Sequence, residues 1–487
     1  MTDLLSLPSA IAERGLLIGG DRVTKSSGGT APNYNPSTGE IQSEVPLAGR
    51  AEIDQAVQAA REASRAWGAT PGPLRASIMH RFAGLIEQNA VEFESLARLE
   101  TGANFPIASN IAPMTAAWAR YFAGWTDKIE GAVIPAGPGT FNYVLREPYG
   151  VIAALMPWNA PAATFAFKAI PALAAGNAVV VKPPELAPHC VLRIGELAVE
   201  AGFPAGVVII VPGGPDAGDA LVRHHWVDKI SFTGGGATAR KVASAAGESL
   251  KPVIMELGGK SANVVFADAD LDVAVAMASM AFTVMSGQAC ALPTRLLVQR
   301  EAYGEVCGRL TQVARSLRVG DPVDLRVDLG PVITESALKR ILGVIQRART
   351  AREGELAAGG ERLGGDLSRG YFLQPTLFID ANPDSALVRE EIFGPVLAVM
   401  PFDTEEEAVA LANDNVYGLG GYVHTSDLRR AHRVAQQLDA GYIGINSFGP
   451  HTPATPFGGN KASGWGREGG SAGLNEFLKL KNIYAPL

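Results

Sequence analysis

The amino-acid sequence predicts an α/β fold made of more than one domain, and three observations support it. Short apolar segments alternate with helical segments from Val151 onwards. The chain has 487 residues, which corresponds to about three domains by length alone. Apolar residues make up 47% and charged residues 19%, a composition that builds large cores and excludes a disordered chain.

The first segment is predicted to be largely helical. Apolar residues fall at helical spacing between Ile53 and Trp67, and again between Ile78 and Leu96. The sequence Thr70-Pro71-Gly72-Pro73 separates these two helices, because proline and glycine favour turns.

Five strand-like segments follow, and their starts lie 22 to 29 residues apart, as strand–helix–strand units require. They are Val151–Met156, Ala178–Lys182, Val207–Val211, Lys229–Phe232 and Pro252–Met255. Gly176 and Gly202 stand where helix C-termini need a left-handed residue. This part therefore predicts a doubly wound, Rossmann-like domain of the nucleotide-binding type.

A second α/β domain is predicted after Glu256, with the predicted helix Ser336–Arg352 between its strands. The strand candidates are Ala262–Phe266, Arg295–Val298, Phe378–Asp380 and Val396–Met400. Residues 353–370 are rich in glycine and charge, so we expect a surface loop there. A cleft between two such domains is a common place for a small-molecule site.

Charge and cysteine content restrict the function. The net charge is −7 and no block of Lys or Arg stands out, which argues against nucleic acid as a partner. Three cysteines in so long a chain are typical of a reducing compartment. Residues 1–10 lack a basic leader region, and no apolar run approaches 18 residues. We expect a cytoplasmic protein that does not enter a membrane.

No metal is expected, because the seven histidines show no spacing typical of metal ligands. They are His80, His189, His224, His225, His424, His432 and His451.

Cys290 and Glu256 are the candidate reactive pair. Cys290 follows Gly287 in a Gly-containing stretch, and Glu256 stands 34 residues earlier at the end of a predicted strand. A thiolate can attack a carbonyl carbon, and a nearby carboxylate can activate water to hydrolyse the thioester. Cys190 and Cys307 lie in apolar helical segments, so we expect them to be structural.

Asn159 is the third candidate, in Pro157-Trp158-Asn159-Ala160-Pro161 after the first strand of the doubly wound domain. A side-chain amide held there could donate a hydrogen bond to a developing oxyanion. Taken alone, an asparagine beside two prolines more often stabilises a turn.

Nine motifs in order resemble those of the aldehyde dehydrogenase superfamily, of the NAD(P)-dependent, non-phosphorylating, hydrolytic type. They are PWNAP from Pro157, VKPPE from Val181, FTG from Phe232, ELGGK from Glu256, GQAC from Gly287, EIFGPV from Glu391, YGL from Tyr417, PFGGNK from Pro456 and GWGRE from Gly464. They span most of the chain, and nine in order are highly specific.

The resemblance implies a role for each matching residue. Cys290 would be the nucleophile, Asn159 with the Cys290 backbone N–H the oxyanion hole, and Glu256 the base that activates water. The cofactor would be held by Trp158, Lys182, Glu185, Phe232, Gly234, Gly235, Leu257, Glu391 and Phe393. Because the Glu185 carboxylate suits free ribose hydroxyls and repels a 2′-phosphate, NAD is expected, with NADP as the alternative.

The chain departs from the family pattern in two places. A hydroxyl residue and a later glycine usually follow the FTG motif, where this chain has Gly235, Gly236 and Ala239. One pyrophosphate contact is therefore missing, although N–H groups at a helix N-terminus can still bind phosphate. Many relatives carry large aromatic residues in the Asn159 loop, where this chain has Ala160 and, further on, Phe167.

The resemblance also implies the domain organisation. Residues 1–128 and 148–257 would form the NAD-binding domain and residues 258–452 the catalytic domain. Residues 129–147 and 470–487 would form a β arm that pairs between subunits, giving a homodimer or homotetramer, and both contain strand-like alternation. Residues 453–469 would return to the cleft between cofactor and substrate.

The substrate expected from this reading is an uncharged, bulky, apolar aldehyde, aromatic or terpenoid-like. The entry channel would be lined by Ala160, Thr164, Phe167, Ala289, Ala291, Phe448 and Phe457, with no Lys or Arg to pair an anionic aldehyde. Two alternatives stay open: a CoA-acylating semialdehyde dehydrogenase, and a non-catalytic relative that keeps the fold as a structural or binding module.

Overall fold

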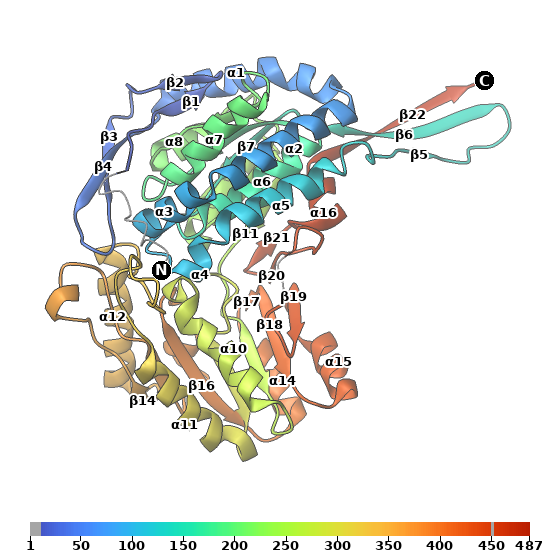
Figure 1. The fold of residues 1–487 in the computed structure, drawn as a ribbon. Helices are drawn as coiled ribbons and strands as arrows, with labels where there is room; N and C mark the ends of the chain where they lie inside the picture. Colours follow the sequence, from blue (N-terminus) through green and yellow to red (C-terminus); the bar gives the residue numbers. More distant parts are fainter. Residues whose placement is uncertain (1–10, 450–451) are drawn as a thin grey trace.

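The computed structural model describes residues 11–449 and 452–487, so His451 lies outside the described residues. Two sheet-centred bodies lie one above the other in Figure 1, and a narrow β arm projects away from them. Both bodies carry helices on both faces of a largely parallel sheet. This confirms the predicted α/β class.

The first sheet has eight strands, and its central five run parallel. In spatial order they are β2 (Asp21–Val23), β1 (Leu16–Ile18), β9 (Val208–Ile210), β8 (Ala178–Lys182), β7 (Val151–Leu155), β10 (Lys229–Thr233), β11 (Val253–Glu256) and β21 (Gly464–Trp465). The chain order reverses between β7 and β10. In doubly wound sheets this switch point opens a crevice at the carboxyl ends of the strands, where ligands bind.

Two apolar cores cover this sheet, one on each face. The larger core is built with α2 (Gly72–Gln88), α3 (Ala90–Thr101), α4 (Phe105–Ala108), α5 (Ile111–Ala123), α6 (Pro161–Ala174) and α7 (His189–Ala201), and α16 (Gly470–Asn475) packs on α6. The other core is built with α1 (Arg50–Ala69), α8 (Pro215–Arg223) and α9 (Gly236–Gly247). Helix α6 starts directly after the loop that carries Asn159, so its first turn borders the crevice.

The second sheet has seven strands, and only its edge strand β14 is antiparallel. The order is β14 (Glu355–Ala358), β15 (Thr376–Ile379), β16 (Val396–Phe402), β13 (Arg295–Gln299), β12 (Ala262–Val265), β18 (Gly420–His424) and β19 (Tyr442–Ile445). One face packs on α10 (Leu271–Thr283) and α11 (Arg300–Ser316), and the other on α12 (Glu335–Ala351), α13 (Ala386–Arg389), α14 (Glu405–Asn413) and α15 (Leu428–Gln437).

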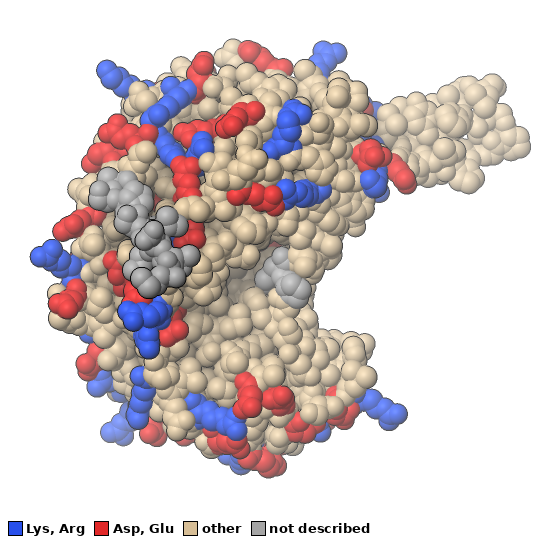
Figure 2. Space-filling view, viewed as in Figure 1, with Lys and Arg blue, Asp and Glu red and all other residues tan. Residues whose placement is uncertain are grey.

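The arm is a three-stranded antiparallel sheet of β5 (Ala132–Val133), β6 (Thr140–Pro148) and β22 (Leu478–Pro486). Every residue of β22 pairs with one of β6. Several large apolar side chains of the arm are exposed: Val133, Ile134, Phe141, Leu145, Leu480 and Tyr484. Figure 2 shows the outer part of the arm free of charged groups.

Two sequence expectations need correction. Residues 353–370 are not wholly a loop, because β14 and the short 3-10 helix η2 (Gly365–Leu367) lie within them. The strand was obscured by its neighbouring glycines and by Ala357 and Ala358, which favour strands weakly. The first segment also contains strands before its helices, namely β1, β2 and the separate hairpin of β3 (Thr30–Tyr34) and β4 (Ile41–Pro46).

The five predicted strands of the first sheet are present, each within one or two residues of its expected ends. Gly176 and Gly202 have φ of +96° and +92°, as their predicted places at helix ends require. Among the described residues, no helix is long and apolar enough to cross a membrane. The predicted boundaries of functional domains remain a prediction.

Candidate active site

A cavity of about 450 Å³ lies at the switch point of the first sheet and brings together residues from both bodies. It is lined by Asn159, Glu256 and Cys290, by six of the residues assigned to the cofactor (Trp158, Gly234, Gly235, Leu257, Glu391 and Phe393), and by all seven assigned to the substrate (Ala160, Thr164, Phe167, Ala289, Ala291, Phe448 and Phe457). Three expected cofactor residues, Lys182, Glu185 and Phe232, lie outside its lining.

Cys290 is carried by a tight turn between α10 and β13. The 3-10 turn η1 (Val284–Gly287) contains Met285, Ser286 and Gly287 in succession with φ of +51°, +53° and +74°. Two consecutive non-glycine residues in the left-handed region cost about 1–3 kcal/mol each and need external support. The Ser286 hydroxyl supplies part of it by donating to the Gly330 carbonyl at 2.9 Å.

Gly287 has a steric reason to be glycine. A Cβ there would lie 2.2 Å from the carbonyl carbon and oxygen of Gly394, so the two backbones touch. The contact brings the Cys290 turn, which precedes β13, against the segment of Glu391 and Phe393, which precedes the neighbouring strand β16. No side chain other than hydrogen fits between them.

The thiol of Cys290 is half-buried and lies among acidic groups. Burial, followed by the charges of Glu391 and Glu256, raises the pKa of Cys290 to about 12. At neutral pH the thiol is therefore protonated, and its attack on a carbonyl needs a group that accepts the proton.

Asn159 lies beside the Cys290 turn. Its Nδ2 donates to the backbone carbonyl of Gln288 at 2.9 Å. Gln288 is held in turn, because its Oε1 accepts from the Ile333 N–H at 3.0 Å and its Nε2 donates to the Met285 carbonyl at 2.9 Å. The amide of Asn159 is thus fixed two residues from Cys290, with a second N–H for a substrate oxygen.

Glu256 ends β11 and is buried, with 4% of its surface exposed. Neither carboxylate oxygen has a hydrogen-bond partner among the described residues. Burial, followed by the charge of Glu468, raises the pKa of Glu256 well above its ordinary value, while Lys168 and Arg467 oppose this shift. An unpartnered buried carboxyl group of this kind is suited to accept a proton from water or a thiol.

Behind Glu256 lies a buried ion pair that the sequence did not reveal. Lys168 Nζ is 2.7 Å from the Glu468 carboxylate and donates to the Ser231 hydroxyl at 3.0 Å. Lys168 is fully buried on α6, and Glu468 lies in the segment that returns to the cavity. The helical pattern places Lys168 on α6, but only the tertiary fold brings it to Glu468, 300 residues later.

The far end of the cavity has a different chemistry. Trp158 and Phe393 meet edge to face, with ring centroids 5.4 Å apart, and Phe393 has a φ of +54°. Glu391 accepts the Gly259 N–H at 3.1 Å, and burial raises its pKa. Thr233, at the end of β10, also lines the cavity, and its buried hydroxyl has no hydrogen-bond partner among the described residues.

The N-terminus of α9 also opens on this end. Its N-cap is Gly235, and a Cβ built on this residue would have no atom within 4 Å beyond its immediate chain neighbours. Steric crowding therefore does not explain why this position lacks a hydroxyl side chain. The free N–H groups of a helix N-terminus favour phosphate. The Thr233 hydroxyl, this helix end and the Glu391 carboxylate together fit a dinucleotide that carries a pyrophosphate and ribose hydroxyls.

The three cofactor candidates outside the lining are placed nearby. Lys182 ends β8, and its Nζ donates to the carbonyls of Gly213 and Pro183. Burial lowers the Lys182 pKa, and the Glu185 charge opposes that shift. Phe232 lies under the Gly234 backbone, where a Cβ on Gly234 would be 2.7 Å from its ring. Phe232 therefore supports the loop from below.

The remaining walls are apolar. Trp118, which the sequence analysis did not identify, packs against Phe167 with ring centroids 4.5 Å apart. Phe448 stacks on Tyr422, whose hydroxyl donates to the Ala291 carbonyl at 2.7 Å. None of the described lining residues is Lys or Arg. Figure 2 shows charge mainly on the outer surface, whereas the recess between the two bodies is bordered mostly by uncharged residues.

Other lining residues were missed because nothing in their local sequence marks them. They are Ala163, Val284, Met285, Leu292, Thr452 and Thr455. Glu468 also lines the cavity and ends the GWGRE motif, but no role was predicted for it.

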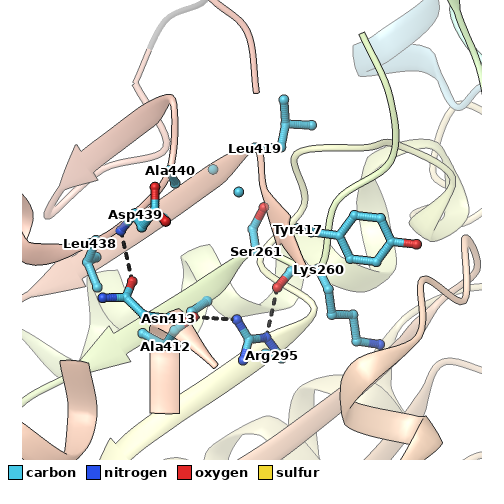
Figure 3. Close-up of a pocket in the computed structure, with 14 residues that line it drawn as sticks. Lys260, Ser261, Arg295, Ala412, Asn413, Tyr417, Leu419, Leu438, Asp439 and Ala440 are labelled. Carbon is cyan, nitrogen blue, oxygen red and sulfur yellow. Dashed lines mark hydrogen bonds between the residues drawn. The ribbon is translucent and has the colours of Figure 1, made fainter. Parts of the chain in front are cut away.

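A smaller cavity of about 20 Å³ is lined by Lys260 and Ser261, which directly follow Gly258–Gly259, and by Arg295, and it is drawn in Figure 3. The Arg295 guanidinium donates to the carbonyls of Lys260 at 2.8 Å and Ala412 at 2.7 Å. Burial lowers the pKa of Lys260 to about 7. The volume is sufficient for a water molecule. Arg295 holds the Lys260 carbonyl, and the preceding residue, Gly259, donates its N–H to Glu391.

Within residues 11–449 and 452–487, no group of three or more His, Cys, Asp or Glu side chains is arranged to hold a metal ion.

Comparison with known proteins identifies the family to which the chain is similar. The profile of the aldehyde dehydrogenase family matches residues 23–483. An aldehyde dehydrogenase from Bacillus cereus, solved as an NAD+ complex, is 38% identical, with a TM-score of 0.95 over 98% of this chain and 97% of that one. PnpE from Pseudomonas sp. WBC-3 is 39% identical, with a TM-score of 0.95 over 98% of both chains.

Betaine aldehyde dehydrogenase from Staphylococcus aureus, solved with NAD+, is 34% identical, with a TM-score of 0.95 over 97% of this chain and 95% of that one. The family match covers most of the sequence, and these structural matches extend over nearly all of it. The chain belongs to the aldehyde dehydrogenase family.

Proposed function

We propose that this protein oxidises an uncharged, bulky apolar aldehyde to the carboxylic acid, with NAD as the electron acceptor. The observation that carries the proposal is the meeting of Cys290, Glu256 and Asn159 in one apolar cavity. One end of this cavity has the polar groups suited to a dinucleotide, and the other has aromatic walls.

The protein's own groups support a stepwise reaction. The Cys290 thiol gives its proton to the Glu256 carboxylate, and its sulfur adds to the aldehyde carbon. Asn159 Nδ2 and the Cys290 N–H stabilise the oxyanion. Glu256 then releases the thiol proton to solvent and becomes a carboxylate again. After oxidation to the thioester, it takes a proton from water, whose oxygen attacks the acyl carbon and releases the acid. Glu256 finally returns its proton to the Cys290 thiolate.

NAD, when bound, supplies the oxidation by accepting a hydride from the aldehyde carbon. Glu391, Trp158 and Phe393 would hold the nicotinamide end, and Lys182 and Glu185 the adenosine ribose. The Glu185 carboxylate disfavours a 2′-phosphate, which supports NAD over NADP. The NAD+ complexes of the Bacillus cereus and Staphylococcus aureus relatives support the same choice.

Hydrolysis is favoured over transfer to CoA because Glu256 is present and its carboxylate has no protein partner among the described residues. A base that is free of other bonds can bind the attacking water. The complete set of reactive groups likewise argues against a purely structural role.

For the domains, we propose residues 1–128 and 148–257 as NAD-binding, 258–452 as catalytic and 453–469 as the segment that closes the cleft. The first sheet and the switch-point cavity support this division. The unpaired state of Cys190, Cys290 and Cys307 supports a reducing compartment such as the cytoplasm.

We also propose a homodimer or homotetramer joined through the arm of residues 129–147 and 470–487. An arm with exposed apolar side chains and an open strand edge is stabilised by association.

Substrate and cofactor choice are tested first. With NAD, we expect kcat/KM for benzaldehyde or a terpenoid aldehyde to exceed that for succinic semialdehyde at least tenfold, because no Lys or Arg is found among the described residues that line the cavity. NADH and NADPH formation at fixed enzyme is the measurement. A preference for succinic semialdehyde would overturn the substrate class, and a higher kcat/KM with NADP would overturn the cofactor assignment.

The role of Glu256 is tested by Glu256→Gln. Loss of a general base lowers rates by about 10²–10⁴-fold, so we expect a matching fall in kcat and slow thioester release. If the substitution slows formation of the Cys290 thioester less than its hydrolysis, stopped-flow measurements record a burst of NADH of at most one equivalent per active site. Glu406→Gln, at an exposed glutamate, serves as the control. Wild-type kcat in Glu256→Gln would remove Glu256 from the mechanism.

The pH dependence follows from the charges around Glu256. Glu468 raises the Glu256 pKa and Lys168 lowers it. Because Glu256 acts as a carboxylate, Glu468→Gln is expected to move the acid limb of the kcat profile to lower pH, and Lys168→Met to higher pH. Circular dichroism confirms that each variant is folded. Shifts in the same direction in both variants would contradict the assignment.

The arm is tested by deleting residues 478–487. Without β22, the edge of β6 lacks its partner, and we expect the apparent mass in light scattering to fall towards that of one chain. An unchanged mass in the folded variant would show that association uses another surface.

A further inference from the structure

A second cavity adjoins the reaction cavity and is not needed for the chemistry described above. It has a volume of about 170 Å³ and lies between α3, α4, α5 and the start of α6. Asn159, Ala160, Ala163 and Met285 line both cavities, so they form the boundary between the two. We call this second space the α3–α6 chamber.

We propose that the α3–α6 chamber is a substrate subsite that takes the distal hydrocarbon part of a long or branched aldehyde. The inference rests on the proposed function and adds that Ala160 and Ala163 set the accepted chain length. The aldehyde carbon stays at Cys290, and the tail passes beside the two alanines.

The lining of the chamber is suited to hydrocarbon. The far walls carry Ala97, Ile107, Ile111 and Met114, and no described lining residue is charged. The Thr101 hydroxyl is already used, since it donates to the Ala97 carbonyl at 2.8 Å within α3. An apolar space with few free polar groups holds water poorly.

The size is also sufficient for a substrate group. An apolar cavity of roughly 150 Å³ stays dry and binds a benzene-sized molecule. The chamber therefore has room for a ring or several methylenes beyond the part of the substrate that lies at Cys290.

The boundary residues explain why the two spaces adjoin. Ala160 is the N-cap of α6, and Ala163 lies in its first turn. Both present only a methyl group to the cavities, and a large side chain at either position would separate them. Met285, in its left-handed turn, belongs to the same boundary because it also lines both cavities.

The test measures kcat/KM for straight-chain aldehydes from propanal to decanal. Each added methylene that enters an apolar site should increase kcat/KM about threefold to fourfold, until the chamber is full. In Ile107→Trp, which fills the chamber from its far wall, the ratio of decanal to propanal kcat/KM should fall at least tenfold. Ala160→Phe should lower the same ratio from the near side.

Leu74→Trp is the control, because Leu74 is exposed on α2 and is not among the residues that line either cavity, and it should retain the wild-type ratio. Thermal unfolding confirms that each variant is folded. Ile107→Trp and Ala160→Phe alter different walls of the chamber, so the proposal can still be tested with one variant if the other does not fold. A wild-type decanal-to-propanal ratio in folded Ile107→Trp would overturn the proposal.

Binding of octan-1-ol to Cys290→Ser, followed by calorimetry, separates this proposal from the proposed function. We expect Ile107→Trp, introduced into the same background, to weaken octan-1-ol binding at least tenfold. If Ile107→Trp weakens octan-1-ol binding but the wild type oxidises no aldehyde, the chamber proposal is supported and the proposed function is wrong. If aldehydes are oxidised and Ile107→Trp leaves octan-1-ol binding unchanged, the chamber proposal fails alone.

Discussion

The buried ion pair of Lys168 and Glu468 is the interaction on which the arrangement of the cavity depends. Lys168 belongs to the helix that also presents Ala160, Thr164 and Phe167, and it donates to Ser231 on β10 as well. The backbone of Glu468 exchanges two hydrogen bonds of 2.7 Å with Phe457. One buried contact therefore joins a helix, a central strand and the returning segment. Removing one partner of such a pair costs about 3–5 kcal/mol, because the other charge stays buried.

The buried, low-dielectric surroundings of this ion pair also determine the pKa values of the acidic groups in the cavity. Cys290, Glu256, Glu391 and Glu468 are crowded into one space, and the cations that oppose them lie behind the wall. Each acidic group makes its neighbour harder to ionise. The proposed transfer from thiol to carboxylate moves a negative charge within this space, without adding another one.

The sequence was most informative where the chemistry needs a particular local pattern. The apolar patterns and glycines around three residues identified their segments directly as the ends of strands or helices. These residues are Cys290, Glu256 and Asn159, and the structure places all three in one cavity. Lys168, Glu468, Trp118 and Met285 were missed for a physical reason. Each becomes a lining or supporting residue only through contacts between segments far apart in the chain. The neighbours of three of them look like ordinary helix or turn, and Glu468, although it ends the GWGRE motif, meets Lys168 only in the folded protein.

The pairing of β11 with β21 has a consequence for how the protein reaches this state. Glu256 occupies a strand whose outer neighbour, Gly464–Trp465, is more than two hundred residues further along, and the whole second sheet intervenes. Contacts of such high sequence separation form slowly, because a long loop must close before they are gained. During synthesis at about 5–20 residues per second, the second sheet emerges before the last strand of the first. The Cys290 thiol is therefore made well before Glu256 is enclosed, and the proposed acid–base pair is complete only when the C-terminal segment arrives.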